Sequence, residues 1–495
     1  MILVIAEKPS VAQTIAAVLG AKEKKDGFLT GSGYIVSWCV GHLVGLSEAA
    51  AYGEQYKKWS YDSLPILPQE WKYTVASDKE KQFKTLKELM HRADVSEVVN
   101  ACDAGREGEL IFRFVYEVAG CRKPTRRLWI SSMEESAIRE GFNNLKDGRE
   151  YDNLYNSALC RAKADWIIGI NATRLFTSLY RKHLNIGRVQ TPTLAMIAER
   201  DSKISMFRKE KYYTVEIDGG NIKAVSDKIS DKDEAQNLQA ACHERQAVCI
   251  SAVKEKKKTG APKLFDLTTL QREANRIFGY TAKQTLDYAQ SLYEKKLITY
   301  PRTDSRYLTD DMHNTVIKIV HIASKFAPFS NCTDFKPDTF CLFNNEKVSD
   351  HHAIIPTAEI ENISLAEIPN GESNILHLIM CKLLCAVNSP YEYETITAVL
   401  ECGGVQFTAK GKIILFEGWK NIEQLFKRYI HSDTDRAEDV FCITKGETVT
   451  VSSEVKEGYT SPPKAFTEDT LLSSMETAGA AETTDEAERK GLGTP

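Results

Sequence analysis

A tyrosine and an arginine two residues apart form the first candidate for covalent chemistry in the 495-residue sequence. In the segment TYPRTDSRYL, Tyr300 ends a short strand-like run, residues 297–300, and stands just before a proline. On an extended chain, side chains at positions i and i+2 point the same way, so Arg302 is expected beside Tyr300. A guanidinium next to a phenol can hold phosphate oxygens and favour the phenolate, as phosphoryl transfer to tyrosine requires. The same pair could instead pack at an ordinary turn.

Acidic side chains follow two of the predicted strands. Glu7 comes directly after the apolar run ILVIA, Asp103 follows EVVNAC, and Glu107 opens the helical pattern that comes next. Ligands of an open parallel sheet bind at the carboxyl ends of its strands, so carboxylates delivered there could share a hard cation such as Mg²⁺. Acids at helix starts are also common in α/β proteins without any metal.

Two further segments have a possible role in catalysis or binding. The segment SDHHAIIPT, residues 349–357, could supply one catalytic imidazole, although a buried or turn histidine fits equally well. In the segment GRVQTPT, residues 187–193, Pro192 is expected at the first position of a helix. A helix N-terminus preceded by Arg and Gln is a natural phosphate site, but it could also be a plain capped helix.

The charge is distributed unevenly along the chain. The formal net charge is −4, whereas residues 155–211 contain eleven Lys and Arg against four acids. A solvated helix face would explain such a cluster, but the local excess over an acidic background also favours a polyanionic partner.

Composition excludes several classes of protein. A hydrophobic share of 42% and a charged share of 27% are typical of folded domains. The sequence has no apolar run long enough for a membrane span and no basic, apolar leader, so we expect a cytoplasmic protein with reduced thiols and no membrane partner. None of the twelve cysteines forms a CxxC pair, which argues against zinc. No GxxxxGK[ST] motif is present, so no ATP site is expected.

The order of predicted elements indicates several domains. Strands alternate with helices up to residue 150, which predicts an α/β domain with a mostly parallel sheet. A helical pattern begins at Leu154. The residues at 212–260 and 392–455 read as β-strands on both sides of a helical insert, and we expect them to form one discontinuous β domain. The fold class is therefore multidomain α/β plus α+β.

Taken together, the motifs resemble type IA DNA topoisomerases, and within them the bacterial topoisomerase III group. Their order matches along the whole chain: IAEKPS, CDAGREGE, GRVQTPTL, FDLTTLQREAN, ITYPRTDSRYL and DHHAIIPT. The resemblance implies a toroid built from a Toprim domain, helical domains and a β arch. The implied domains are a Toprim domain at 1–150, a helical DNA-binding domain at 151–211 and 456–495, the arch at 212–263 and 392–455, and a helical domain carrying the tyrosine at 264–391.

The resemblance also implies a role for each candidate residue. Tyr300 would attack a single-stranded DNA phosphodiester, giving a 5′-phosphotyrosine and a free 3′-hydroxyl, and Arg302 would stabilise the phosphoryl group. Glu7 would handle the proton of the leaving oxygen, with Lys8 as a fixed charge nearby. The remaining implied sites are His351 near the tyrosine, a Mg²⁺ site of Glu7, Asp103 and Glu107, and a DNA-backbone site of Gly187, Arg188, Val189, Gln190, Thr191, Pro192, Arg161 and Arg174.

The implied activity is ATP-independent. One strand is cut, another passes through, and Mg²⁺ supports religation, which relaxes negatively supercoiled DNA or separates linked molecules. The covalent bond conserves the phosphodiester energy, which fits the absence of an ATP motif. The partners would be single-stranded and negatively supercoiled DNA, and the protein would be associated with the nucleoid.

The sequence departs from the family pattern in two places. Gly105 stands where the family has a second aspartate, as in some Toprim relatives on mobile elements, so the metal site loses one carboxylate. The chain also stops at a Thr-Pro helix start, which predicts truncation, a poorly ordered segment 478–495, and an apolar face at Trp166, Ile167 and Ile170 left exposed.

Other functions remain open at this stage. The chain could be a catalytically impaired fragment that only binds single-stranded DNA. It could also be another Toprim or tyrosine enzyme, such as a primase, a nuclease or a tyrosine recombinase. A recombinase would leave a 3′-phosphotyrosine and would not need the acidic cluster.

Overall fold

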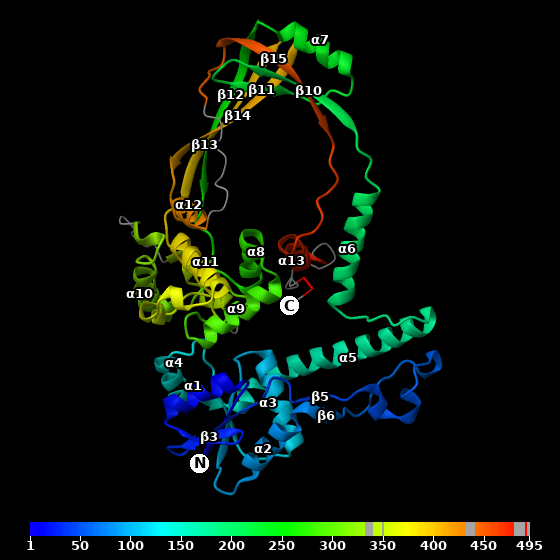
Figure 1. Cartoon of the computed structure of the whole chain (residues 1–495), viewed down its shortest axis with the longest axis vertical. Coiled ribbons are helices and arrows are strands. Elements are labelled where there is room, and N and C mark those ends of the chain that lie inside the picture. The colour runs from blue at the N-terminus through cyan, green and yellow to red at the C-terminus, as the bar shows by residue number, and fades with distance from the viewer. Residues whose placement is uncertain (332–339, 349–350, 431–440, 480–490, 493–495) are drawn as a thin grey trace.

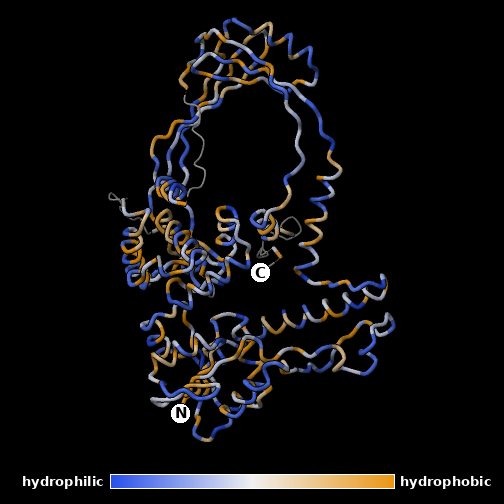
Figure 2. Tube along the Cα trace, viewed as in Figure 1, coloured by the Kyte–Doolittle hydropathy of each residue, from blue (hydrophilic) through white to orange (hydrophobic). Residues whose placement is uncertain are grey.

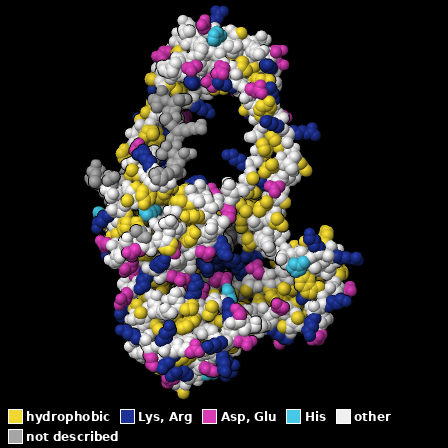
Figure 3. Space-filling view, viewed as in Figure 1, with side chains coloured by type: hydrophobic (Ala, Val, Ile, Leu, Met, Phe, Trp, Pro, Cys, Tyr) yellow, Lys and Arg dark blue, Asp and Glu magenta, His cyan; other side chains and the backbone are white. Residues whose placement is uncertain are grey.

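The computed structural model describes residues 1–331, 340–348, 351–430, 441–479 and 491–492. The chain forms an elongated ring (Figure 1), with a β barrel at one end and helices and an α/β domain at the other. The space-filling view shows that the ring surrounds an open hole (Figure 3).

The α/β domain is built on a seven-stranded sheet in the order β2-β3-β4-β1-β7-β8-β9. The central strands β4, β1, β7 and β8 run parallel, and the apolar residues of β4, β1 and β7 form a strongly hydrophobic part of the trace in this domain (Figure 2). Helices α1 to α4 connect and cover the strands. The bounds are β1 Ile2–Ala6, α1 Pro9–Leu19, β2 Glu23–Lys25, β3 Phe28–Gly31, β4 Tyr34–Trp38, α2 Glu80–His91, β7 Glu97–Ala101, α3 Arg106–Ala119, β8 Thr125–Arg127, α4 Glu135–Asn143 and β9 Lys146–Asp147.

An arm leaves this domain through the two-stranded sheet of β5 (Val44–Leu46) and β6 (Tyr73–Val75). The arm runs along the long helix α5 (Asp152–Tyr180), as Figure 1 shows. It covers Trp166, whose indole nitrogen donates to the Ser47 carbonyl oxygen at 2.9 Å and whose ring meets two aromatic rings of the arm. The expectation that Trp166 belongs to an exposed apolar face is therefore wrong, because a segment distant in sequence packs on it.

The two β segments meet in one closed barrel with the order β10-β11-β14-β13-β12-β15. Two helices also lie in these segments, α7 and α12, so reading 212–260 and 392–455 as strands alone is wrong. Helix α6 (Gln190–Ser205) and the segment after β15 lead to the barrel on one side of the ring (Figure 1). The bounds are β10 Lys211–Asp218, β11 Lys223–Ser226, α7 Lys232–Cys242, β12 Arg245–Thr259, β13 Tyr391–Cys402, β14 Val405–Phe416, α12 Trp419–Tyr429 and β15 Thr448–Tyr459.

The helices between the barrel strands pack around α11, which is buried along most of its length. The predicted strand at 297–300 does not form, and only an isolated bridge between Ile298 and Pro356 is present there. Most of the predicted disordered segment, residues 480–490 and 493–495, lies outside the described residues. The bounds are α8 Leu267–Phe278, α9 Ala282–Glu294, α10 His313–Ala323, α11 Asn370–Ala386 and α13 Glu468–Thr477.

Candidate active site

Two carboxylates meet at the carboxyl edge of the parallel sheet. Strands β1 and β7 are neighbours with Ala6 opposite Ala101, so the residues that follow them emerge side by side. Glu7 is 6% exposed and Asp103 lies on the turn into α3. Gly108 allows this turn, because a β-carbon there would lie 2.0 Å from the Asp103 carbonyl oxygen. Gly108 therefore lets the first turn of α3 pack directly against the Asp103 backbone.

Tyr300 reaches this edge from the helical domain above. Its hydroxyl donates to Asp103 Oδ2 at 3.1 Å, and its backbone N–H donates to the Ser131 carbonyl oxygen at 3.0 Å. The side chain is 6% exposed and its ring lies 4.4 Å from the His351 ring and 5.3 Å from that of Tyr293. The candidate nucleophile is thus fixed between the two halves of the site.

Burial of both acids, and repulsion by Asp103 at Glu7, set their protonation. The pKa of Glu7 is raised to about 7, first by burial and then by the charge of Asp103, while Arg302, Lys8 and His42 oppose the shift. Burial also raises the pKa of Asp103, against Lys8 and the Tyr300 hydrogen bond. A carboxyl group with a pKa near neutrality can both give and take a proton.

The tyrosine itself is not preactivated. Burial, and then the charge of Asp103, holds the pKa of the Tyr300 phenol well above its usual range. The charge of Arg302 lowers that pKa, which fits the expected closeness of the two side chains, although Arg302 itself is exposed to solvent. Positive charge near the hydroxyl would favour loss of the phenol proton.

His351 is buried and electrically neutral. Burial lowers its pKa to about 4. Its Nε2 contacts the Ala104 carbonyl oxygen and must therefore carry the proton, while Nδ1 accepts from the Ser131 hydroxyl at 3.0 Å. The ring stacks on Trp129 and lies tilted against Tyr300, so it packs the tyrosine in place rather than supplying charge.

Sequence reasoning missed the arginine that supports the site. Arg127 is 1% exposed and donates to the carbonyl oxygens of Cys102 and Asp103 at 2.6 and 2.7 Å. Its charge is balanced by Glu109, at 3.1 Å, which also pairs with Arg113. Glu109 is 1% exposed and fully engaged, so it cannot replace the carboxylate missing at Gly105. Only the apolar residues that follow Arg127, at 128–130, hint in the sequence at its burial.

The third predicted metal ligand lies apart from the other two. Glu107 is half exposed and forms an ion pair with His42 at 3.4 Å, which holds the pKa of the carboxyl below its usual range. Within the described residues, no group of three or more His, Cys, Asp or Glu side chains is close enough to hold a metal ion. Glu7 and Asp103 nevertheless fit a hard divalent cation, because a cation would offset the burial that raises both pKa values and the repulsion by Asp103 that further raises the pKa of Glu7.

The predicted DNA-backbone residues fall into two groups. Arg161 lines a 430 Å³ pocket together with His42 and Glu107, beside the site, and Arg188 pairs with Asp165 of α5 at 2.8 Å. Figure 3 shows Lys and Arg side chains gathered in the cleft between the α/β domain and the helices above it.

Arg174 does not belong to this surface. It is 6% exposed, donates to the Tyr56 carbonyl oxygen at 2.7 Å and lies over the Trp59 ring, so it ties α5 to the arm. This placement does not support the prediction that Arg174 contacts DNA, because its guanidinium is bound to Tyr56 and Trp59 of the arm.

The 187–192 segment lies where α6 begins. The helix starts at Gln190, two residues before Pro192, and not at the proline as predicted. The Gly187 N–H donates to the Thr191 hydroxyl at 3.1 Å, and the Thr191 N–H donates to the Gly187 carbonyl oxygen. These bonds close a tight loop in which Val189 precedes the first turn, with Arg188 and Gln190 exposed.

Comparison with known proteins agrees with this geometry. The family described as DNA topoisomerase matches residues 149–495, and the Toprim domain matches residues 2–133. The chain therefore belongs to the type IA DNA topoisomerase family, and it is an ATP-independent DNA topoisomerase, an isomerase.

Within this family the chain is topoisomerase III-like. It is 41% identical over 504 residues to DNA topoisomerase 3 of Bacillus subtilis (strain 168), covering 99% of this chain and 68% of that one. It is 42% identical over 488 residues to DNA topoisomerase 3 of Bacillus cereus (strain ATCC 10987), covering 96% and 67%. The full-length topoisomerase I of Thermotoga maritima shares the fold, with a TM-score of 0.73 at 24% identity over 96% of this chain and 75% of that chain.

Proposed function

We propose that the chain cuts one strand of DNA through Tyr300. The observation that carries the proposal is the hydrogen bond from the Tyr300 hydroxyl to Asp103, 3.1 Å long, at an edge where Glu7 holds a proton near neutral pH. The tyrosine oxygen attacks the phosphorus and the bond to the 3′-oxygen breaks. The phenol proton passes to Asp103, and Glu7 gives its proton to the leaving 3′-oxygen, so a 5′-phosphotyrosine and a 3′-hydroxyl result.

The cationic side chains act on the phosphate. Arg302 and Lys8 both influence the protonation of Glu7 and Asp103, so their charges lie close enough to reach a phosphodiester placed between Tyr300 and the acids. Arg302 is free to turn towards that phosphate, because it is exposed and forms no ion pair within the described residues. Their charges would stabilise the added negative charge of the transition state.

Religation runs the same steps in reverse. Glu7 and Asp103 would hold Mg²⁺, without Glu107 as it lies in this structure, and the ion would supply positive charge near the 3′-hydroxyl and the phosphate. Glu7 then takes the proton of the attacking hydroxyl. The covalent bond keeps the energy of the phosphodiester, so no other energy source is needed.

The basic cleft would bind single-stranded DNA, including strands opened in negatively supercoiled molecules. Helices α5 and α6 form one side of this cleft. On that side lie Arg161, Arg188 and the rest of the 187–192 loop. The hole of the ring would receive the passing strand, giving relaxation or decatenation. Among the described residues, no helix is long and apolar enough to cross a membrane. Association with the nucleoid would follow from DNA binding alone.

The test is to trap the covalent adduct on single-stranded DNA labelled at either end. We expect the protein on the new 5′ end created by the break, so that the adduct keeps the 3′ label, and no adduct with Tyr300→Phe although binding persists. A 3′ attachment, or an adduct in the Phe variant, would refute the assignment. The comparisons favour the enzyme over a fragment that only binds DNA, and a trapped adduct separates the two directly.

A further inference from the structure

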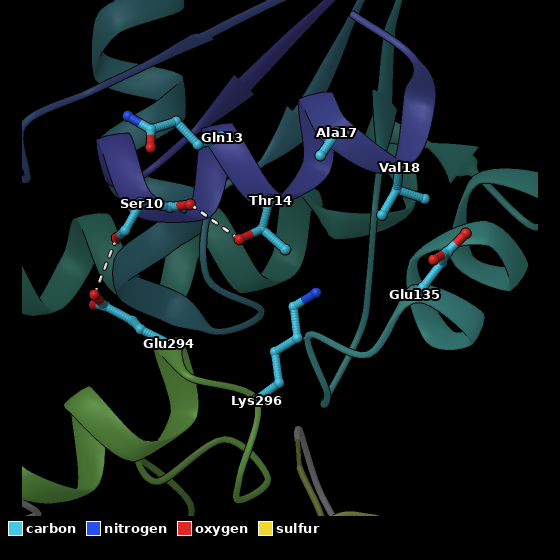
Figure 4. A pocket seen from close by; sticks show the side chains of 8 residues that line it. All are labelled: Ser10, Gln13, Thr14, Ala17, Val18, Glu135, Glu294 and Lys296. Atoms are coloured by element: carbon cyan, nitrogen blue, oxygen red, sulfur yellow. Dashed lines mark hydrogen bonds between the residues drawn. The ribbon is translucent and has the colours of Figure 1, made fainter. Parts of the chain in front are cut away.

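A glutamate at the end of α9 joins the tyrosine-bearing helices to the α/β domain. Glu294 Oε1 accepts from Lys8 Nζ at 3.2 Å, and its Oε2 accepts from the Ser10 hydroxyl at 3.0 Å. Figure 4 shows Glu294 reaching from α9 to the first turn of α1, where Ser10 lies. We call these two bonds the Glu294 contact.

The position of Glu294 is unfavourable for its own helix. It is the last residue of α9, where the helix dipole disfavours a negative charge. Its carboxylate instead faces the start of α1, whose dipole and two donors favour that charge. On its own helix it also accepts from Gln290 at 3.1 Å. The unfavourable interaction of Glu294 with the dipole of α9 is therefore offset mainly by its bonds to Lys8 and Ser10 across the interface.

Lys8 has a second attraction besides Glu294. Its charge lowers the pKa of both Asp103 and Glu7, so the ammonium lies within the field of the proposed reaction centre. A phosphodiester bound at Tyr300 would compete with Glu294 for the same ammonium. A bound phosphodiester would therefore weaken the Glu294 contact.

The interface loses another bond during the reaction. Once the Tyr300 oxygen is joined to phosphorus, it has no proton to donate to Asp103. Within the described part of the chain, Lys8–Glu294 is the only ion pair between residues 1–150 and 264–391. This pair, together with the attraction of Arg302 for Glu7 and Asp103, then remains as charge attraction between the tyrosine-bearing helices and the α/β domain.

We infer that Glu294 is a positioning residue that sets how readily the tyrosine-bearing domain separates from the α/β domain after cleavage. The inference rests on the proposed function, since separation matters only if Tyr300 holds the cut strand. Both side chains are partly exposed, at 29% and 27%, and a 510 Å³ groove lined by Ser10, Glu135 and Lys296 brings solvent to the contact. Salt should therefore weaken it.

The experiment holds one single-stranded DNA under low tension and records opening of the cut strand as steps in its length. Glu294→Gln keeps the shape and removes the charge. We expect adduct formation to persist and opening to become roughly two- to tenfold more frequent. Salt should accelerate opening of the unmodified protein and change the variant little. Ser10→Ala should give a smaller increase.

Glu135→Gln is the matched control, because Glu135 lines the same groove but pairs with Arg139 of its own helix. Equal opening rates for Glu294→Gln and the unmodified protein at low and high salt would overturn the inference. An equal shift in Glu135→Gln would also overturn it. Absence of any cleavage in the unmodified protein would instead count against the proposed function, so the two failures are distinguishable.

Discussion

Adding the missing carboxylate at Gly105 should strengthen the metal site. The backbone there is extended, with φ 166°, which any residue can adopt, and a β-carbon meets nothing within 4 Å. Gly105→Asp therefore changes charge with little strain. Glu109 cannot already fill the gap, because Arg127 and Arg113 hold it.

The expected magnitude follows from the charges at the site. A carboxylate about 4 Å from a divalent ion gains about 8 kcal/mol at an effective dielectric constant of 20. Most of this gain is offset, since the added charge further raises the pKa values of Glu7 and Asp103, and the ion must displace their protons and its own water. A net gain of about 1.4 kcal/mol corresponds to a tenfold lower Mg²⁺ requirement.

The assay follows resealing of a trapped adduct as Mg²⁺ is added. Gly105→Asp should reach half-maximal resealing at about one tenth of the Mg²⁺ concentration that the unmodified protein needs. Gly105→Asn is the control, with the same shape and no charge, and should leave the requirement unchanged. If Asp and Asn shift the requirement equally, or neither shifts it, the charge argument is wrong.

Three further changes test other parts of the site. Arg302→Lys keeps the charge but loses the planar guanidinium, so cleavage should slow while binding, measured by gel shift, changes little; an unchanged rate would mean a structural role. With chelator present, the cleavage rate should fall about tenfold per pH unit above the Glu7 pKa of about 7, because only protonated Glu7 can donate a proton to the leaving oxygen. The cleavage rate of Glu7→Gln should show no such dependence on pH. Arg127→Met leaves Glu109 with one buried partner fewer and should lower unfolding stability by about 3 kcal/mol, whereas the exposed neighbour Arg126→Met should not, as thermal unfolding would show.

Much of the fold could be predicted, but local errors have a common cause. The alternation of strands and helices before residue 150 predicts the parallel sheet, because buried strands need continuous apolar runs. The helices α7 and α12 were missed within the β segments, and the strand at 297–300 was predicted where only one bridge forms. Short segments with few apolar residues take the structure that their distant neighbours allow.

The sequence by itself determined the chemistry and the family. Tyr300, Arg302, Glu7 and Asp103 stand in short contiguous motifs, and the residue types in those motifs limit what reactions are possible. The close approach of Gly108 to Asp103, in contrast, comes from the structure.

Only the tertiary structure decided which of these side chains meet and in what state. Asp103 and Tyr300 are 197 residues apart in sequence and share a hydrogen bond, while Glu109, six residues from Asp103, is taken up by buried arginines. Arg174 lies under the arm and His351 is neutral, although neither fact is visible in the sequence. The physical reason is that burial, pKa and side-chain direction depend on atoms brought together from distant segments, and local sequence carries no record of those neighbours.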